Sequence, residues 1–510
     1  MDVATFLRRG IVDHADREAV VFENVRLTFS QVSKRANALA YGLAELGLKD
    51  QDAVAVLEDN NIPAVDAFIG LALGGFVRVP LYARNASSGH ASMLSLAGCK
   101  ALLVGPEHFN EVAELKDALP DLKHVIITDG NYERWLLEYM DQSVDVKVNG
   151  SSLFAIRFTG GTTGLPKGVP TTHSQFLNQV RDWFYAFPPA TSEDAVLHAA
   201  PITHASGSLL LPLWAAGGRN ILMRQFDPSA VLSAFEQERV SYVFLPPTAI
   251  NVLTRHPEVA ARDHAHLKVL MTAAAPINED TTLRARACFG DVLFQGYGLS
   301  ECFPIAMMSA TEWFASVEGS DPLRACGKPL PFVNVQIWND DNEVLKRGEI
   351  GEIVAQCDGQ MTAYWQSPQE TAETLVDGWI KTGDVGRLDE NGYLYVLDRK
   401  KDLIISGGFN LYPAEIENVV AAIPGVVEVA VIGAPDERWG EAPIAIVVTD
   451  SDLSSEVVLQ AVGERLGSYK KPREVVISRD PLPKTPVGKL DKKVLREPYW
   501  KGRTRGVSGA

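Results

Sequence analysis

The segment from Phe158 to Gly168 (FTGGTTGLPKG) concentrates glycine, hydroxyl and lysine side chains directly after the apolar run Leu153–Ile156. Glycine lets backbone amides approach phosphate oxygens, threonine hydroxyls donate further hydrogen bonds, and Lys167 adds a positive charge. The segment is not a Walker loop, because Pro166 stands where that loop has glycine and Gly168 replaces its serine or threonine. We therefore predict a phosphate-binding loop of another kind; a glycine-rich turn with a purely structural role is the alternative.

This loop resembles the phosphate-loop signature of the adenylate-forming enzymes, which include acyl- and aryl-CoA synthetases, peptide-synthetase adenylation domains and firefly-type luciferases. The resemblance extends nearly over the whole chain, because other segments match the family's remaining motifs in the family's order. They are Gly296–Glu301 (GYGLSE, with Ser300 where threonine is commoner), Thr382–Asp384 (TGD), Asp398–Asp402 (DRKKD) and Pro483–Lys489 (PKTPVGK).

The resemblance implies a two-step reaction with ATP and coenzyme A as co-substrates. A carboxylate is a poor acyl donor, because its leaving group would be an oxide. ATP would first convert the acid into an acyl-adenylate with release of pyrophosphate, and the thiol of CoA would then displace AMP. Catalysis would depend mainly on positioning and electrostatic stabilisation.

The resemblance also implies roles for residues around the nucleotide. Glu301 would bind Mg²⁺, which prefers oxygen ligands. Tyr297 would stack on adenine and Ser300 would bond the α-phosphate, while Asp384 and Arg399 would hold the ribose hydroxyls. The loop residues that would hold the β- and γ-phosphates are Thr159, Gly160, Gly161, Thr162, Thr163, Gly164 and Lys167, and the remaining nucleotide-side residues are Ala275 and Gly298.

Two lysines would serve different steps. Lys489 would reach the reacting carboxylate and the α-phosphate together, whereas Lys401 would be the hinge about which a small domain rotates after adenylation. The rotation would bring the turn at Gly407 and Gly408 against the large domain, where its backbone would line a tunnel for the pantetheine arm of CoA. For each charged or aromatic residue, a structural role as core filler, turn residue or solvated charge is the competing interpretation.

The acyl pocket is expected around His204, where family members carry an aromatic residue or histidine. No acidic residue lies between Ala195 and Met223, which disfavours an amino acid as substrate. The pocket residues Ala273, Ala274, Phe303 and Met307 leave room for an apolar acid that is aromatic, alicyclic or of medium to long chain. A buried structural histidine is the alternative for His204. The basic segment Lys470–Arg473 is interpreted as a surface loop, with an approach to the CoA phosphates as the second reading.

Competing functions are a stand-alone enzyme that loads a carrier protein or feeds a luciferase-like oxidation, and a non-catalytic nucleotide-binding homologue. The absence of an appended carrier motif favours CoA as acceptor. A kinase or ATPase is disfavoured by Pro166.

The elements that must position these residues follow an α/β pattern. Short strands at Ala53–Leu57, Phe76–Pro80 and Ala101–Val104 alternate with helices, one of which is expected to begin with Ser30 as its cap and to stop at Gly47. This alternation predicts parallel-rich sheets covered by helices. We expect a large N-terminal domain over residues 1–400, with a β subdomain at about 330–400, and a small mobile α+β domain over residues 401–510.

Composition limits the partners. The chain has 510 residues, 48 Lys and Arg against 64 Asp and Glu, and a net charge of −16, which argues against coating nucleic acid. Five scattered cysteines predict reduced thiols, and the absence of a signal peptide or a long apolar run predicts a cytoplasmic protein without a membrane span. The expected partners are a small carboxylic acid, ATP and CoA; the oligomeric state is open, and a homodimer is one of the states the sequence allows.

Overall fold

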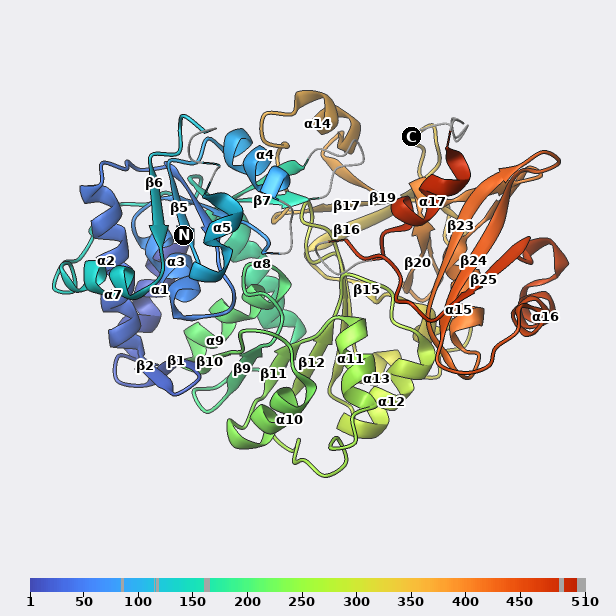
Figure 1. The fold of residues 1–510 in the computed structure, drawn as a ribbon, viewed down its shortest axis with the longest axis horizontal. Helices are drawn as coiled ribbons and strands as arrows, with labels where there is room; N and C mark the ends of the chain where they lie inside the picture. Colours follow the sequence, from blue (N-terminus) through green and yellow to red (C-terminus); the bar gives the residue numbers. More distant parts are fainter. Residues whose placement is uncertain (84–86, 114, 116–118, 160–165, 486–489, 502–510) are drawn as a thin grey trace.

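The computed structural model describes residues 1–83, 87–113, 115, 119–159, 166–485 and 490–501 (Figure 1). Two parallel-rich sheets form most of the chain up to about residue 330, an antiparallel sheet follows, and the segment after residue 403 builds a further sheet with its own helices. In Figure 1 this last segment, coloured orange to red, lies at the opposite end of the molecule from the blue N-terminal helices.

The first sheet ends in the predicted phosphate loop. Its strand order is β6 (His124–Ile127), β5 (Ala101–Val104), β3 (Ala53–Leu57), β4 (Val77–Pro80), β7 (Leu153–Thr159) and β8 (Lys167–Thr172). All neighbours are parallel except β7 and β8, which are antiparallel and stand on either side of the loop. One face is covered by α2 (Phe29–Glu45), α3 (Ile62–Leu73) and α7 (Gly130–Leu137), the other by α4 (Ser87–Ala97) and α5 (Phe109–Val112).

The second sheet carries the predicted adenine and acyl residues. Its order is β15 (Lys328–Pro329), β14 (Ala306–Ser309), β13 (Leu293–Tyr297), β12 (Val269–Thr272), β11 (Tyr242–Phe244), β9 (Ala195–His198), β10 (Arg219–Leu222), β1 (Glu18–Phe22) and β2 (Val25–Thr28). The centre is parallel, and β2, β14 and β15 are antiparallel additions at the edges. Strand β1 pairs with β10, so that Val20 lies opposite Asn220.

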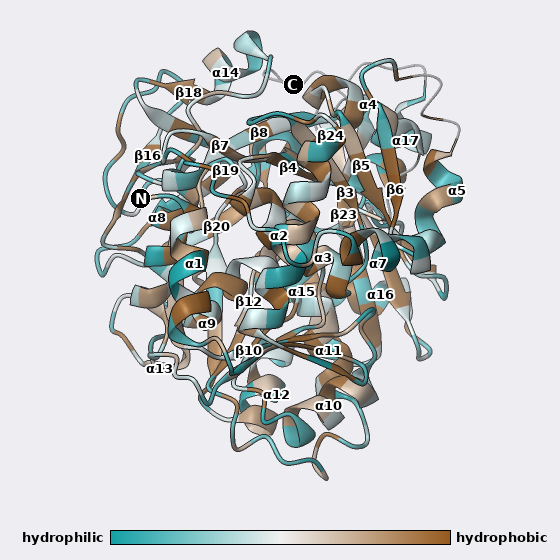
Figure 2. Cartoon of the chain, turned by 90° about the vertical axis from the view of Figure 1, so that its left-hand side faces the viewer, coloured by the Kyte–Doolittle hydropathy of each residue, from teal (hydrophilic) through white to brown (hydrophobic). Residues whose placement is uncertain are grey.

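Helices and the antiparallel sheet cover the second sheet. One face packs against α10 (Pro228–Gln237), α11 (Pro247–Thr254), α12 (Glu279–Phe289) and α13 (Ala310–Trp313). The other face packs against α8 (His173–Ala186), α9 (Leu210–Ala216) and strands of the antiparallel sheet. A separate cluster joins α1 (Val3–Asp13), α2 and α3 to β1, β7 and β10, and so connects the two sheets. Figure 2 shows the strands as largely hydrophobic and the outer helices as mixed, as expected for buried sheets under amphipathic helices.

The antiparallel sheet has the order β16 (Val333–Trp338), β17 (Gly351–Cys357), β19 (Trp379–Leu388) and β18 (Leu375–Val376), with β20 (Leu394–Arg399) also paired to β19 and with α14 (Pro368–Thr374) beside it. After the 3₁₀ turn Lys400–Asp402, the last sheet has the order β22 (Phe409–Leu411), β21 (Ile404–Ser406), β24 (Gly440–Thr449) and β23 (Val426–Asp436), with β25 (Glu474–Ser478) paired to β24. It packs with α15 (Pro413–Ala421), α16 (Ser455–Leu466) and α17 (Lys492–Trp500).

The expected α/β class is therefore confirmed, whereas one expected cap is wrong. Helix α2 begins after Thr28, whose side chain accepts the amide of Gln31 while the Gln31 side chain accepts the amide of Thr28. This reciprocal capping box satisfies two amides at once, so Ser30 lies inside the first turn instead of capping it. Among the described helices, none is both long enough and apolar enough to cross a membrane.

Candidate nucleotide and acyl site

Three predicted nucleotide residues meet directly. The hydroxyl of Tyr297, at the end of β13, donates to Asp384 Oδ2 at 2.6 Å, and Arg399 Nε lies 2.8 Å from Asp384 Oδ1. The antiparallel pairing of β19 and β20 creates the second contact, because it sets Asp384 opposite Arg399. Asp384 is buried, and the pKa of the Tyr297 hydroxyl is raised, first by burial and then by the Asp384 charge.

Glu301 lies shortly after the end of β13 and is only 9% exposed. Its Oε1 accepts a hydrogen bond from the Tyr364 hydroxyl at 2.6 Å, and Lys167 Nζ lies 5.0 Å from the centre of the Tyr364 ring. Burial, followed by the charge of Glu301, raises the pKa of Tyr364. Tyr364 thus links the predicted metal ligand to the predicted phosphate lysine, although no sequence motif indicated this residue.

The phosphate loop is described only at its two ends. Thr159 closes β7 and lies opposite Lys167, which opens β8. The Trp365 amide donates to the carbonyl of Gly168 at 2.8 Å, which fixes the start of β8 against the segment that carries Tyr364. The residues predicted between these ends lie outside the described part of the chain, as does Lys489: they are Gly160, Gly161, Thr162, Thr163 and Gly164.

The predicted pocket residues gather on one side of β12 to β14. Ala273 and Met307 are buried in one hydrophobic cluster, and Phe303 packs against it with its ring centre 5.4 Å from that of Trp183. Ala274 has a positive φ of 72°, and both it and Ala275 are exposed. Exposed small side chains beside a buried apolar cluster leave space for an apolar group.

A glycine makes the turn after β13 possible. A Cβ atom on Gly298 would lie 2.7 Å from Phe303 Cδ2 and 3.1 Å from the carbonyl oxygen of Cys302. Only glycine therefore fits where the chain turns from Tyr297 toward Ser300 and Glu301.

The His204 side chain is exposed to solvent, although protein atoms also lie densely around its ring. Its ring meets the Tyr82 ring edge-on at 4.7 Å, and Nδ1 lies 2.9 Å from Thr203 Oγ1. Removal from bulk water lowers the pKa of His204 to about 4, and the positive charges of Arg157 and Arg78 act in the same direction. The imidazole is therefore neutral at physiological pH.

The predicted hinge is anchored on both sides. Lys401 lies in the 3₁₀ turn, the next residue Asp402 accepts from Arg496 at 2.5 Å, and Asp398 accepts the Ala414 amide at 2.9 Å. Burial raises the pKa of Asp398 to about 6.

Gly407 and Gly408, the predicted CoA-facing turn, connect β21 to β22 with φ values of 58° and 83°. The space above Gly407 is taken by the Trp439 ring, since a Cβ would lie 2.6 Å from it. Trp439 and Phe409 are exposed at this turn.

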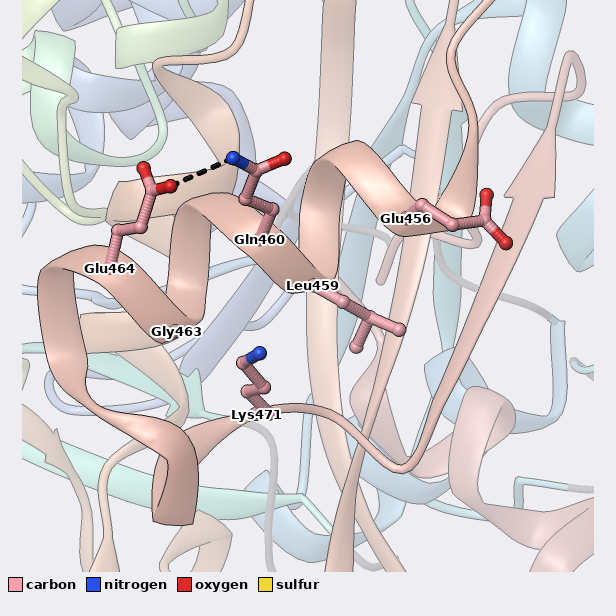
Figure 3. A pocket seen from close by; sticks show the side chains of 6 residues that line it. All are labelled: Glu456, Leu459, Gln460, Gly463, Glu464 and Lys471. Atoms are coloured by element: carbon pink, nitrogen blue, oxygen red, sulfur yellow. Dashed lines mark hydrogen bonds between the residues drawn. The ribbon is translucent and has the colours of Figure 1, made fainter.

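The basic segment 470–473 is already largely neutralised, because Lys470 pairs with Glu415 and Arg473 with Asp436. Lys471 instead borders a surface hollow beside α16 (Figure 3). The other residues that line it are Glu456, Leu459, Gln460, Gly463 and Glu464. These pairings and the acidic lining favour the surface-loop interpretation over contact with CoA phosphates.

Two family models match this chain. The AMP-binding enzyme model covers residues 7–365, and the model of the AMP-binding enzyme C-terminal domain covers residues 415–489. The chain belongs to the AMP-binding enzymes. Both matches fit the order of the motifs along the chain.

Curated relatives are similar over almost their full length. The chain is 33% identical to the medium/long-chain-fatty-acid–CoA ligase FadD8 of Mycobacterium tuberculosis, over 97% of this chain and 89% of that protein. It is 36% identical to a feruloyl-CoA synthase of Amycolatopsis sp, over 94% and 96%. Among solved structures, the amide bond synthetase McbA from Marinactinospora thermotolerans has a TM-score of 0.87 at 30% identity, covering 96% of this chain and 99% of that one. The expected family, fold class and class of acid–thiol ligases are confirmed; the site roles and the domain boundary at Lys401 stay predictions.

Proposed function

We propose that this AMP-binding enzyme is a Mg²⁺- and ATP-dependent carboxylate–CoA ligase that acts on an apolar acid and releases AMP and pyrophosphate. The observation that carries the proposal is the direct contact among Tyr297, Asp384 and Arg399, which come from separate strands. An aromatic face, an acceptor carboxylate and a planar cation at one point suit adenine and the ribose hydroxyls.

The first half-reaction needs charge compensation, because a carboxylate attacks an α-phosphate. Lys167 and the amides of the loop would hold the triphosphate, and Lys489 would bring the carboxylate to the α-phosphate. The donor set fits Mg²⁺, because the Glu301 carboxylate is a hard oxygen ligand whose Oε1 is oriented by Tyr364, and phosphate oxygens supply the rest. Bound there, Mg²⁺ would neutralise charge on the phosphates.

The second half-reaction needs the adenylate to meet a thiol. The turn at Gly407 and Gly408 would form the pantetheine tunnel after rotation at Lys401. The exposed Phe409 and Trp439 beside that turn support this role, because apolar side chains that lie open in one arrangement gain by being covered in another.

The substrate class rests on the pocket and on the relatives. Ala273, Phe303 and Met307 form an apolar wall, and similar proteins are named for fatty acids, for ferulate and, at 32% identity, for indoleacetate. We therefore assign an aromatic, alicyclic or medium- to long-chain acid. A carrier protein is the second candidate acceptor. It is favoured by ScoC of Streptomyces coeruleorubidus, which is 32% identical over 97% of this chain and is named a fatty acid–acyl-carrier-protein ligase.

The test is a panel of benzoates, cinnamates, cyclic acids and C4–C16 fatty acids, assayed for pyrophosphate exchange and then for acyl-CoA formation. Exchange with at least one class, followed by thioester formation with free CoA, supports the proposal. Exchange without acyl-CoA, together with acylation of an added carrier protein, would instead support the second acceptor. No exchange with any acid would remove the proposed function.

A further inference from the structure

Two arginines stand on neighbouring strands of the first sheet, and the described residues offer neither of them an anionic partner. Arg78 in β4 lies opposite Ala155, two residues before Arg157 on the adjacent strand β7. Arg78 is only 5% exposed, and its guanidinium carbon lies 4.3 Å from the centre of the Phe68 ring. Its Nε is buried and has no hydrogen-bond partner among the described residues.

No carboxylate within the described ranges lies at ion-pair distance from either guanidinium. Arg157 donates to the Thr171 hydroxyl at 3.3 Å. Burial lowers the pKa of Arg157, and the charge of Glu301 acts in the opposite direction. Burial, followed by the charge of Arg157, lowers the pKa of Arg78 to about 9, so the side chain is still charged at neutral pH. A buried cation without a counter-charge is strongly unfavourable, and a second cation beside it adds repulsion. Such a pair is tolerated where an anion binds.

The position of Arg157 identifies which anion that is. It lies two residues before Thr159, where the phosphate loop begins. It is close enough to Glu301 to feel that charge, and its own charge helps to lower the pKa of His204. Arg157 is also partly exposed, so a ligand can reach it. The proposed first half-reaction brings two anions to this place, and the triphosphate is already assigned to the loop, Lys167 and Glu301. The anion that remains is the carboxylate of the acid.

We infer that Arg157 binds the reacting carboxylate of the acid before adenylation and that Arg78 is a positioning residue, whose like charge repels the Arg157 guanidinium toward the carboxylate. This inference rests on the proposed function. Both arginines belong to the first sheet, so they would hold the carboxylate whatever the arrangement of residues 401–510. The carboxylate would thus be oriented before Lys489 arrives.

The kinetic test uses Arg157→Met, Arg157→Lys and Arg78→Met, with decanoate or benzoate as the acid according to which the wild type uses. In Arg157→Met the KM for the acid should rise about 10- to 100-fold, as for the loss of a charged hydrogen bond, while the KM for ATP changes by less than about twofold. Arg157→Lys should recover part of the loss, and Arg78→Met should show a smaller increase in the same KM. Arg286→Met is the matched control, because Arg286 also lies over an aromatic ring, Phe314 at 4.2 Å, but pairs with Asp291 at the surface.

A binding test without turnover separates this inference from the proposed function. Without ATP, decanoate and decanesulfonate should raise the melting temperature of the wild type more than decanol does, and Arg157→Met should lose that difference. If the wild type exchanges pyrophosphate with no acid, the proposed function fails. The melting experiment still shows whether Arg157 binds a carboxylate. A folded Arg157→Met with unchanged acid KM and an unchanged anion effect overturns the inference. An increase in KM that occurs only with dicarboxylic acids also overturns the inference, because the arginines would then bind a second carboxylate and not the reacting one. If Arg78→Met does not fold, the Arg157 variants decide alone.

Discussion

The site contains two carboxylates, Asp384 and Glu301, whose neighbouring side chains differ in charge. Asp384 is bound by the cation Arg399 and by Tyr297, so its charge is compensated within the protein. Glu301 accepts from the neutral hydroxyl of Tyr364, and the predicted phosphate lysine, Lys167, lies over that ring instead of pairing with the carboxylate. A carboxylate oriented by a neutral donor keeps its charge for a ligand, which suits the role predicted for Glu301.

We expect Glu301→Gln to lower the rate of adenylation by about 10²-fold or more, comparable to about 3 kcal/mol of transition-state stabilisation, because the site facing the triphosphate loses its charge. The fold should persist, since glutamine can still accept the Tyr364 hydrogen bond. Pyrophosphate exchange and a melting curve measure both properties. Tyr364→Phe is the graded comparison, with a loss of about tenfold, the size of one charged hydrogen bond. Exchange by Glu301→Gln at the wild-type rate would contradict the assignment.

The site was predictable where its residues lie in contiguous motifs. Glu301 and Tyr297 were expected from one six-residue segment, and the described ends of the phosphate loop from another. Tyr364 was not, because it is an isolated aromatic residue 63 positions after Glu301 that only the fold brings to the carboxylate. Arg78 and Arg157 were not predicted for the same reason. The pairing of two strands makes them neighbours, and no local spacing in the sequence indicates that pairing.

At the scale of elements, the turn between β13 and Glu301 is set by close packing. We expect Gly298→Ala to destabilise the protein by about 1–3 kcal/mol and to lower adenylation, because the new methyl group would press on the Phe303 ring and on fixed backbone atoms. Gly130→Ala is the matched control, since a Cβ there meets no atom within 4 Å. Thermal melting and pyrophosphate exchange are the measurements. Equal melting temperatures for the two variants would show that the turn relaxes without cost.

The ends of β3 and β5 are joined by a pH-dependent contact. His108 lies 3.5 Å from Asp59 and 3.5 Å from Glu111, with only 13% of its side chain exposed. The contact with Asp59 is the main cause that raises the pKa of His108 to about 8. Because the folded-state pKa exceeds the unfolded value of about 6.5, the stabilisation is complete below pH 6.5 and is lost as the pH rises through 8.

We therefore expect the free energy of unfolding to fall by up to about 1 kcal/mol between pH 7 and pH 9, a value reduced for partial contact with water. His108→Gln should remove this part of the pH dependence. Urea denaturation of both proteins at the two pH values is the measurement. Parallel pH profiles for wild type and variant would refute the contribution of His108.

Elements with clear local signals were predictable, and those defined by distant partners were not. The strands β3 and β5 begin and end where their apolar runs indicated, because the signal lies within the strand itself. The two-residue strands β15 and β18 have no sequence signal of their own; each exists because a neighbouring strand offers hydrogen bonds. The cap of α2 was misassigned because Ser30 and Thr28 are both suitable types, and only the reciprocal bond with Gln31 distinguishes them.

At the scale of the whole molecule, the proposed reaction depends on movement at the turn Lys400–Asp402. We expect Lys401→Pro to retain adenylation and to slow thioester formation, because proline fixes φ at the position predicted to rotate. Single-turnover rates of each step measure this, with synthetic acyl-adenylate supplied for the second. Lys401→Ala controls for loss of the side chain and should transfer at close to the wild-type rate.

If Lys401→Pro loses both steps, circular dichroism and a melting curve decide the cause. A normally folded variant that has lost both steps would rule out separate arrangements for the two half-reactions. A variant that transfers as fast as Lys401→Ala would show that rotation occurs elsewhere in the chain.

The pairing of β1 with β10 has a consequence for a chain that is still being made. Val20 lies opposite Asn220, so the partner strand leaves the ribosome only after 200 further residues, about 10–40 s later at usual rates of synthesis. During that interval β1 has β2 on one side and an open edge on the other, whereas all strands of the first sheet are synthesised before β10 is made. The beginning of the nascent chain therefore has an unpaired strand edge for tens of seconds, and it is exposed to chaperones and to other nascent chains throughout that time.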